Sequence, residues 1–478
     1  MSKLNWYTRA CALFVGLSTA AVTLPAQTFK TLDSFDNADG AAPWATLVQG
    51  SDGSLFGTTQ NGGNTACALG CGTIFQITPN GTLTMFSFDA TNGSDPYAGL
   101  VQTADGDFYG VTSTGGTGNG GGLCATNCGT VFKITPGGKL TTLHNFDWTD
   151  GASPTGTLIQ ATDGNIYGTT QIGGASGSGS IFKMTSSGTF TTLYSFTGGA
   201  DGALPVAGLI QATDENLYGT TWGYGDHNQN DGTVFKITLS GTLTTLHSFE
   251  LTDGALPFAG LVQATDGDFY GATEEGGTYN YGTIFKMTPK GKLTTLHSFS
   301  GGTDGDTPIS TLIQATDGNF YGTTSYDGAH PNFGTVFAIT PSGNLTTLHN
   351  FDSTDGSYPY AGLVQATSGG FYGATFAGGS SSACEFGCGT VFSLSVGLGP
   401  FVKTVPAAGK VGAAERILGT NLTGATSVTF NGTAAVFTVG SASEITTTVP
   451  AGATTGTVQV VTLSGTALSS NAPFRVLP

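Results

Sequence analysis

The chain has 478 residues, of which only 9% are charged, and its 31 acidic and 14 basic residues give a formal net charge of −17. The Lys and Arg residues form no cluster that could neutralise phosphates, so the sequence predicts no nucleic-acid partner. The negative charge also disfavours binding to anionic membrane surfaces. A content of 77 Gly residues could indicate disorder, but 38% hydrophobic and 10% aromatic residues favour a folded chain with a buried core.

Residues 1–26 have the pattern of a secretory signal peptide. Lys3 and Arg9 are the positive residues of its n-region, the apolar run ACALFVGLSTAAVTL follows, and LPA precedes Gln27. The apolar run is too short for a permanent membrane anchor. No other segment has a helical pattern against which a buried N-terminal helix could pack. We therefore predict cleavage near Ala26, a secreted, periplasmic or surface location, and no membrane insertion of the mature chain.

A unit of about 50 residues repeats seven times between residues 27 and 396. Each unit contains segments such as GLVQATDGDFYGAT (260–273), GTVFKIT (129–135) and LTTLHSF (243–249). Asp-Gly and Pro-x-Gly sequences favour tight hairpin turns, and Val, Ile, Thr, Phe and Tyr dominate the segments between them. Each unit therefore predicts four short strands. One aromatic residue marks the third strand of every unit: Phe75, Phe132, Phe182, Phe235, Phe285, Phe337 and Phe392.

Four strands in each of seven units predict a seven-bladed β-propeller, and the alternative is a linear solenoid. The ends of the array distinguish the two. Residues 28–35 read as a fourth strand without the first three, and residues 389–396 read as a third strand without a fourth. Because the N-terminal strand is the one that the last blade lacks, pairing of the two ends would close a ring. We therefore predict an all-β ring over residues 27–396 that is closed by its N-terminal strand.

The repeats resemble the GloVer tandem repeat of bacterial exported proteins, as in GTVFKITPGGKLTTLHNF (129–146) and GLIQATDENLYGTT (208–221). This resemblance implies a secreted or surface protein and supplies no catalytic residues. Residues 397–478 lack the repeat motif and contain alternating strand-like segments such as ITTTVPAGATTGTVQVVT (445–462). They resemble an IPT/TIG domain, which implies an immunoglobulin-like β-sandwich that acts as a spacer or interaction module.

Six cysteines remain once Cys11 is removed with the signal peptide, and all six lie in C-x3-C pairs. An even and locally paired count in an exported chain predicts disulfides. A structural zinc site needs four ligands, whereas each loop offers two. A redox role favours Cys-x-x-Cys in an electropositive setting, which these loops lack. The sequence therefore predicts no metal and three disulfides: Cys67–Cys71, Cys124–Cys128 and Cys384–Cys388.

The tight turns of an antiparallel blade lie at one end, and the longer loops and blade-to-blade crossings lie at the other. The longer loops vary most among the repeats, so binding residues are expected there. The cysteine loops belong to blades 7, 1 and 2, whereas blades 4 to 6 carry WGYGDHNQND (222–231), EEGGTYNYG (274–282) and SYDGAHPNFG (325–334). We predict that these three loops supply the binding residues: Trp222, Tyr224, His227, Tyr279, Tyr281, Tyr326, His330 and Phe333.

Other polar residues have structural interpretations. Four histidines fill one repeat position and are interpreted as scaffold: His144, His247, His297 and His349. His227 and His330 lie among loop carboxylates, where a metal or acid–base site could be built, but no motif spacing supports one. Three pairs of carboxylates in the crossings could bind Ca²⁺, although Asp before Gly more often forms a turn: Asp36/Asp39, Asp147/Asp150 and Asp352/Asp355.

Three functional classes fit these features. The absence of a nucleophile–base constellation or metal motif favours a non-catalytic binding or adhesive scaffold for glycans or other surface polymers. The first alternative is an extracellular polysaccharide lyase or hydrolase that uses the same loops, because propellers also host catalysis. The second alternative is a purely structural envelope protein. The sequence predicts no catalytic residues and no cofactor.

Overall fold

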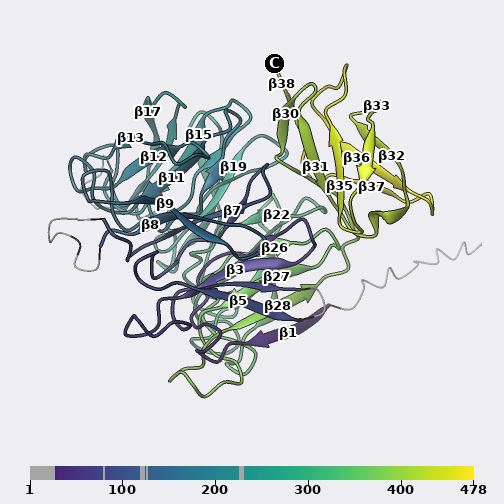
Figure 1. Cartoon of the computed structure of the whole chain (residues 1–478). Coiled ribbons are helices and arrows are strands. Elements are labelled where there is room, and N and C mark those ends of the chain that lie inside the picture. The colour runs from purple at the N-terminus through teal and green to yellow at the C-terminus, as the bar shows by residue number, and fades with distance from the viewer. Residues whose placement is uncertain (1–26, 79–80, 119–123, 125–126, 226–230) are drawn as a thin grey trace, which may run out of the picture.

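The computed structural model describes residues 27–78, 81–118, 124, 127–225 and 231–478 (Figure 1). The predicted signal peptide, residues 1–26, lies outside the described residues. Within the described part the chain is all-β, apart from one short 3-10 helix, η1 (Leu422–Gly424). No helix in these ranges has the length and apolar character needed to cross a membrane.

Seven four-stranded antiparallel sheets make up the described part of the repeats, and we number them sheet 1 to sheet 7 in chain order. The first strands are β2 (Val48–Gln49), β6 (Val101–Gln102), β10 (Ile159–Gln160), β14 (Ile210–Gln211), β18 (Val262–Gln263), β22 (Ile313–Gln314) and β26 (Val364–Gln365). The second strands are β3 (Leu55–Thr59), β7 (Phe108–Thr112), β11 (Ile166–Thr170), β15 (Leu217–Thr221), β19 (Phe269–Thr273), β23 (Phe320–Thr324) and β27 (Phe371–Thr375). The third strands are β4 (Thr73–Ile77), β8 (Thr130–Ile134), β12 (Ser180–Met184), β16 (Thr233–Ile237), β20 (Thr283–Met287), β24 (Thr335–Ile339) and β28 (Thr390–Ser395). The fourth strands are β5 (Leu83–Ser87), β9 (Leu140–Asn145), β13 (Phe190–Ser195), β17 (Leu243–Ser248), β21 (Leu293–Ser298), β25 (Leu345–Asn350) and, for sheet 7, β1 (Thr28–Ser34).

The core lies between neighbouring sheets, and its packing explains the recurrent Tyr-Gly and Phe residues. In sheet 5, a Cβ on Gly271 would lie only 2.6 Å from Cζ of Phe285, so the Phe ring needs a glycine opposite it. Between sheets 4 and 5, the rings of Tyr218 and Phe269 pack with centroids 4.3 Å apart. Both rings are buried, at 1% and 0% exposure. Each sheet thus buries apolar residues against its neighbours, as the apolar character of both strand faces indicates.

The two ends of the repeat array pair with each other. Strand β1 runs antiparallel to β28, with Phe29 opposite Leu394 and Ser34 opposite Thr390. Phe35, directly after β1, is 0% exposed. The N-terminal strand therefore supplies the fourth strand of sheet 7, as the sequence predicts.

A glutamine at the end of the first strand ties sheet 1 and sheets 3 to 7 each to a neighbouring sheet. The Gln211 Oε1 accepts a hydrogen bond from the Thr162 backbone N–H at 2.9 Å, while its Nε2 donates to the Thr162 Oγ1 at 3.1 Å. The same backbone-to-glutamine bond is made by Gln160, Gln263, Gln314, Gln365 and Gln49. The last of these joins sheet 1 to sheet 7, because Gln49 accepts from Thr367. Hydrogen bonds therefore link the last sheet back to the first.

Each of the seven crossings has a non-glycine residue with a left-handed backbone conformation at one equivalent position. Leu256, with a φ of 55°, illustrates their role. Its N–H donates to the Asp231 carbonyl of the preceding sheet at 2.8 Å, and its own carbonyl accepts from the Glu274 N–H at 3.1 Å. The conformation is unfavourable for such a residue but is held by bonds on both sides. The equivalent residues are Ala42, Asp95, Ser153, Leu204, Thr307 and Tyr358.

The C-terminal region is a β-sandwich. Its first sheet contains β29 (Lys403–Val405), β31 (Ala414–Leu418), β35 (Glu444–Thr448) and β34 (Phe437–Val439). The second contains β33 (Thr433–Ala434), β32 (Ala425–Phe430), β36 (Val458–Thr462) and β37 (Ala467–Ser469), and a parallel pair joins β30 (Ala408–Lys410) to β38 (Arg475–Leu477). Ile417, Ile445, Phe430 and Val460 belong to one buried core, so both sheets contribute to it.

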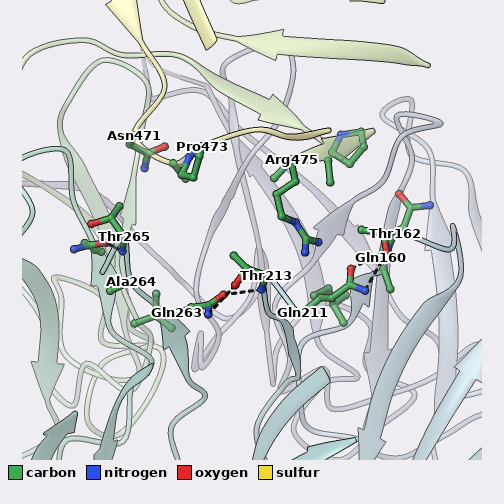
Figure 2. A pocket seen from close by; sticks show the side chains of 18 of the residues that line it. Gln160, Thr162, Gln211, Thr213, Gln263, Ala264, Thr265, Asn471, Pro473 and Arg475 are labelled. Atoms are coloured by element: carbon green, nitrogen blue, oxygen red, sulfur yellow. Dashed lines mark hydrogen bonds between the residues drawn. The ribbon is translucent and has the colours of Figure 1, made fainter. Parts of the chain in front are cut away.

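The sandwich contacts the repeat array at the end that carries the tight turns. The Arg475 Nη1 donates to the Ala212 carbonyl at 2.8 Å, and the Ser443 Oγ donates to the Ser51 carbonyl at 2.8 Å. Figure 2 shows Arg475 reaching from the sandwich toward Gln211 and Thr213 across a cleft of about 570 Å³. The tight-turn end of sheets 3 to 6 is therefore partly covered by the sandwich.

A buried carboxyl group makes the sandwich sensitive to pH. Glu415 is 3% exposed, neither carboxyl oxygen has a hydrogen-bond partner among the described residues, and burial raises its pKa from 4.5 to about 8. The unfolded chain ionises this group from about pH 4.5 upward, whereas the folded chain does so only near pH 8. Its contribution to stability is therefore complete below pH 4.5 and declines as the pH rises toward 8.

Glu415→Gln is expected to remove this pH dependence, because the amide cannot ionise. Calorimetry of the full chain at pH 8 and above should show the sandwich of the variant melting roughly 5 °C or more above that of the parent. At pH 4 the two proteins should melt alike. Glu385→Gln, which alters an exposed carboxylate outside the sandwich, should leave this profile unchanged. A parent profile that is flat between pH 5 and pH 8 would contradict the buried neutral carboxyl.

Candidate functional site on the loop face

The end of the array opposite the sandwich is formed by the loops between second and third strands and by the sheet-to-sheet crossings. We call this surface the loop face. The antiparallel order of every sheet places these segments together and puts both tight turns of each sheet at the other end. Because the sandwich contacts the tight-turn end, the loop face is the more accessible of the two.

A cluster of aromatic rings lies at the centre of the loop face, and the Trp44 ring contacts each of the other four rings. The Trp44 ring centroid lies 4.3 Å from that of Tyr360, 5.3 Å from that of Tyr97 and 5.5 Å from that of Phe376. It also lies 6.4 Å from the ring of Phe258 in sheet 5, which is not a sequence neighbour of sheet 1. All five residues are half-buried. We call these five residues the axial cluster.

Two further groups extend the axial cluster toward sheets 4 to 6. The Tyr326 hydroxyl lies 3.2 Å from the Tyr360 hydroxyl. The Trp222 indole N–H donates to the Glu274 Oε2 at 2.9 Å and joins sheet 4 to sheet 5. Burial raises the pKa of Glu274 despite this bond, and the Glu274 charge in turn helps to raise the pKa of Tyr360. The carboxylate therefore lies within electrostatic range of the axial cluster.

Sheet 6 places two incompletely bonded polar groups at this face. Ser325 is 1% exposed, and its hydroxyl has no hydrogen-bond partner among the described residues. The same holds for Oδ1 of Asp306. Burial raises the pKa of Asp306 to about 6, and the nearby charge of Asp327 adds to this effect. Buried polar atoms without partners are uncommon and are often completed by water, an ion or a ligand.

The predicted binding residues lie in different surroundings in the structure. Tyr326 contacts the axial cluster through Tyr360, and Trp222 is hydrogen-bonded to Glu274. Three tyrosines are exposed on the outer loops, at 45% for Tyr224, 58% for Tyr279 and 43% for Tyr281. Phe333 packs against the core between sheets 6 and 7, and His330 is exposed. His227 lies outside the described residues.

None of the five members of the axial cluster was predicted from the sequence. Four of them occupy one repeat position: Trp44, Tyr97, Phe258 and Tyr360. Each directly follows a proline in a crossing, and the position is filled by Thr155, Val206 and Ile309 in the other three repeats. A position that changes from Trp to Thr between a repeated Pro and a repeated Leu is a sequence signal for function. The ring contacts of Trp44 show that four of these positions come together in the fold.

The loop face is acidic and its segments contain no Lys or Arg. Its segments are the crossings (35–47, 88–100, 146–158, 196–209, 249–261, 299–312 and 351–363) and the loops (60–72, 113–129, 171–179, 222–232, 274–282, 325–334 and 376–389). The described residues of these segments include no Lys or Arg and eighteen carboxylic acids: Asp36, Asp39, Asp89, Asp95, Asp147, Asp150, Asp201, Asp231, Glu250, Asp253, Glu274, Glu275, Asp304, Asp306, Asp327, Asp352, Asp355 and Glu385. At the tight-turn end, by contrast, lysines pair with turn aspartates, as in Lys133–Asp107 at 2.9 Å and Lys183–Asp163 at 3.3 Å.

Family models identify both parts of the chain. The model described as the Gloeobacter/Verrucomicrobia repeat matches residues 20–126, 120–267 and 229–436. The chain belongs to this repeat family. The model of the IPT/TIG domain matches residues 403–476, which form the C-terminal sandwich. No curated protein matches this Gloeobacter/Verrucomicrobia repeat protein significantly.

Several solved structures are similar at low sequence identity. A fungal alcohol oxidase of the AA5 family, in complex with copper, has 13% identity and a TM-score of 0.49, with 94% of this chain and 99% of that chain covered. A putative 6-phosphogluconolactonase from Bacteroides uniformis has 16% identity and a TM-score of 0.43, with coverages of 64% and 83%. The PQQ-bound aldose sugar dehydrogenase from Streptomyces coelicolor has 13% identity and a TM-score of 0.40, with coverages of 77% and 98%. These identities are too low to transfer an activity to the repeat protein.

The repeated histidines of the Gloeobacter/Verrucomicrobia repeat protein hold its crossings in place. The His144 Nε2 lies 2.7 Å from Oδ2 of Asp150, and the His349 ring stacks on Phe29 of β1 at 3.6 Å. The same His–Asp contact recurs at His247–Asp253, His297–Asp304 and His349–Asp355. These contacts agree with the interpretation of the histidines as scaffold.

The paired aspartates form turns. The Asp36 Oδ1 accepts the backbone N–H groups of Ala38 at 3.0 Å and of Asp39 at 3.2 Å, as in an Asx turn. The equivalent bonds of Asp147 and Asp352 have the same pattern. Within the described ranges, no three His, Cys, Asp or Glu side chains lie close enough to hold a metal ion.

The three predicted disulfides are confirmed: Cys67–Cys71, Cys124–Cys128 and Cys384–Cys388. The backbone carbonyl of the second cysteine in each pair also accepts a hydrogen bond from the crossing that leads to the next sheet. The Cys388 carbonyl accepts the Ala42 N–H at 2.9 Å, and the Cys71 carbonyl accepts the Asp95 N–H at 3.3 Å. The bridges therefore fix three consecutive junctions, including the one that joins sheet 7 to sheet 1.

Replacing both Cys67 and Cys71 by alanine is expected to leave the protein folded. Closing so short a loop contributes about 2 kcal/mol in the chain-entropy model. Hydrogen exchange should become faster at the Asp95 amide, which bonds to Cys71, and the 60–72 loop should become more sensitive to protease. The Leu256 amide, in a crossing without a bridge, serves as the internal control. Exchange that accelerates equally at both amides would show that the bridge supports the whole array rather than its own junction.

Proposed function

We propose that the seven sheets form a seven-bladed β-propeller and that the protein is a secreted or cell-surface binding scaffold for glycans. The cyclic hydrogen bonds, which include those from sheet 7 to sheet 1, support the closed propeller. The two family matches and the three disulfides support an extracellular setting. The sequence pattern of residues 1–26 supports export by a cleaved signal peptide.

The observation that carries the glycan proposal is the placement of half-buried aromatic rings beside polar side chains on one accessible face. Trp44, Tyr360 and Trp222 offer flat apolar surfaces, and the Tyr326 hydroxyl and Glu274 carboxylate offer hydrogen-bonding groups beside them. A pyranose ring presents apolar C–H faces and polar edges, so it matches such a surface. The exposed Tyr224, Tyr279 and Tyr281 extend the same surface outward.

Binding of the purified chain to an array of neutral, amino and acidic oligosaccharides tests this proposal. Trp222→Ala is expected to weaken binding of the recognised oligosaccharide about tenfold, because one aromatic contact is lost. Phe386→Ala is the matched control, since Phe386 is 73% exposed on the loop face but lies in a disulfide loop of sheet 7. Equal losses in both variants, or no binding on the array, would reject the glycan site.

One observation favours a catalytic alternative on the same face. Burial raises the pKa of both Glu274 and Asp306, and a carboxyl whose pKa is raised in this way is better suited to donate a proton in glycoside cleavage. Incubation with the bound oligosaccharide, followed by mass spectrometry, distinguishes the alternatives. The scaffold proposal expects intact oligosaccharide. Products that disappear in Asp306→Asn would establish an enzyme.

A further inference from the structure

We propose that the loop face recognises a glycan that carries protonated amino groups, such as a polymer of glucosamine with free amines. This inference rests on the proposed glycan-binding function and specifies the class of ligand. Its basis is the combination of the aromatic surface with a complete absence of Lys and Arg from the loop-face segments.

The charge distribution excludes one large class of glycans. Polyuronates and sulfated glycans favour Lys and Arg as partners for their acid groups, and the loop-face segments supply neither. On the opposite end, Lys133, Lys183 and Lys286 pair with turn aspartates and keep that surface close to neutral. The net charge of −17 is therefore distributed unevenly, and the loop face attracts cations.

The polar groups beside the axial cluster suit an ammonium group. Glu274 accepts one bond from Trp222 and keeps further lone pairs for a donor. The buried Ser325 hydroxyl and Oδ1 of Asp306 lack partners among the described residues. An ammonium group supplies three donors and a positive charge, and it also favours the faces of aromatic rings. An amino sugar would therefore place its ring on the Trp and Tyr side chains and its charge beside the carboxylates.

Titration calorimetry of the full chain with three oligosaccharides of equal length tests this inference. The probes are a glucosamine oligomer with free amines, its N-acetylated counterpart and a polyuronate oligomer, each near neutral pH at low and high salt. The free-amine oligomer is expected to bind about tenfold more tightly than the acetylated one at low salt, because several weak charge contacts add. High salt should remove most of this difference, since it screens exposed charges.

Two variants locate the charge effect. Glu274→Gln removes one charge but retains an acceptor for Trp222, so it should weaken binding of the free-amine oligomer more than binding of the acetylated one and thereby reduce the preference for free amines. Glu385→Gln makes the same change in net charge in a disulfide loop, where Glu385 is exposed, and should leave the preference intact. An equal effect of both variants would show a diffuse electrostatic field rather than a site, which contradicts the inference.

The remaining outcomes separate this inference from the proposed function. Equal, salt-independent binding of the free-amine and acetylated oligomers would overturn the amino-sugar inference but leave glycan binding standing. Tighter binding of the polyuronate would also overturn it. Failure of all three probes, together with a negative array, would reject both.

Discussion

Deletion of residues 27–35 is expected to prevent the repeat array from folding as a closed unit. The deletion removes β1, so β28 becomes the unpaired edge strand of sheet 7. It also removes the ring of Phe29, which stacks on His349 at 3.6 Å and on Phe392 at 5.2 Å. Loss of one buried Phe side chain costs about 3–5 kcal/mol, and a typical domain is stable by only 5–15 kcal/mol. The loss of Phe29, Phe35 and the strand pairing together should exceed this margin.

Soluble yield and thermal unfolding monitored by circular dichroism measure this effect. Paired substitutions in the same strand provide the control. Phe29→Ala with Phe35→Ala should lower the melting temperature strongly, whereas Thr28→Ala with Lys30→Ala should change it little, because the latter two side chains are exposed. Addition of a synthetic 27–35 peptide to the truncated protein should partly restore stability. A truncated protein that melts like the parent would show that β1 is dispensable for closure.

Trp44→Ala is expected to have the second largest effect, because it removes the hub of the axial cluster. The Trp44 ring contacts aromatic rings from sheets 2, 5 and 7, so its loss opens a gap where four sheets meet. Since Trp44 is only half-buried, the expected loss in the free energy of unfolding is about 2–3 kcal/mol, at or below the low end for a large-to-small substitution. Glycan binding should fall with it, because the flat surface is lost.

Urea denaturation of Trp44→Ala measures the stability change, and titration of the oligosaccharide at low temperature, where the variant is folded, measures the binding change. Trp44→Phe keeps an aromatic ring and should recover most of both quantities. Phe386→Ala, which removes an exposed ring, should cost about 0.5 kcal/mol or less. If Trp44→Ala were as stable as the parent, the packing role assigned to the cluster would be wrong.

The sequence predicts the strands and their order well because the same physical constraints recur seven times. The Asp-Gly turns, the Gly opposite a Phe and the leftover N-terminal strand each have one simple structural solution. Local spacing also predicts the disulfides, since C-x3-C loops can close without long-range contacts. The first strands are shorter than the sequence suggests: β18 is Val262–Gln263 alone, because the flanking Leu261 and Ala264 turn into the crossing and the hairpin.

The candidate site could be predicted only in part. Trp222 and Tyr326 lie in loops whose composition differs from the other repeats, so the sequence indicates them directly. Trp44 and Phe258 lie more than two hundred residues apart in the sequence and come into contact only in the assembled fold. Phe333 is partly buried and packs against the core between sheets 6 and 7. Long-range convergence and burial are properties of the assembled fold, so a single repeat carries no signal for them.

Hydrogen–deuterium exchange of the full chain with and without a glucosamine oligomer tests the central claim most directly, because it reports which face the ligand covers. The proposed site predicts slower exchange in residues 40–46, 274–282 and 325–334 on the loop face. It predicts unchanged exchange at the tight turns and at Arg475 in the cleft beneath the sandwich. Protection confined to that cleft, or to the sandwich itself, would contradict a binding site on the loop face.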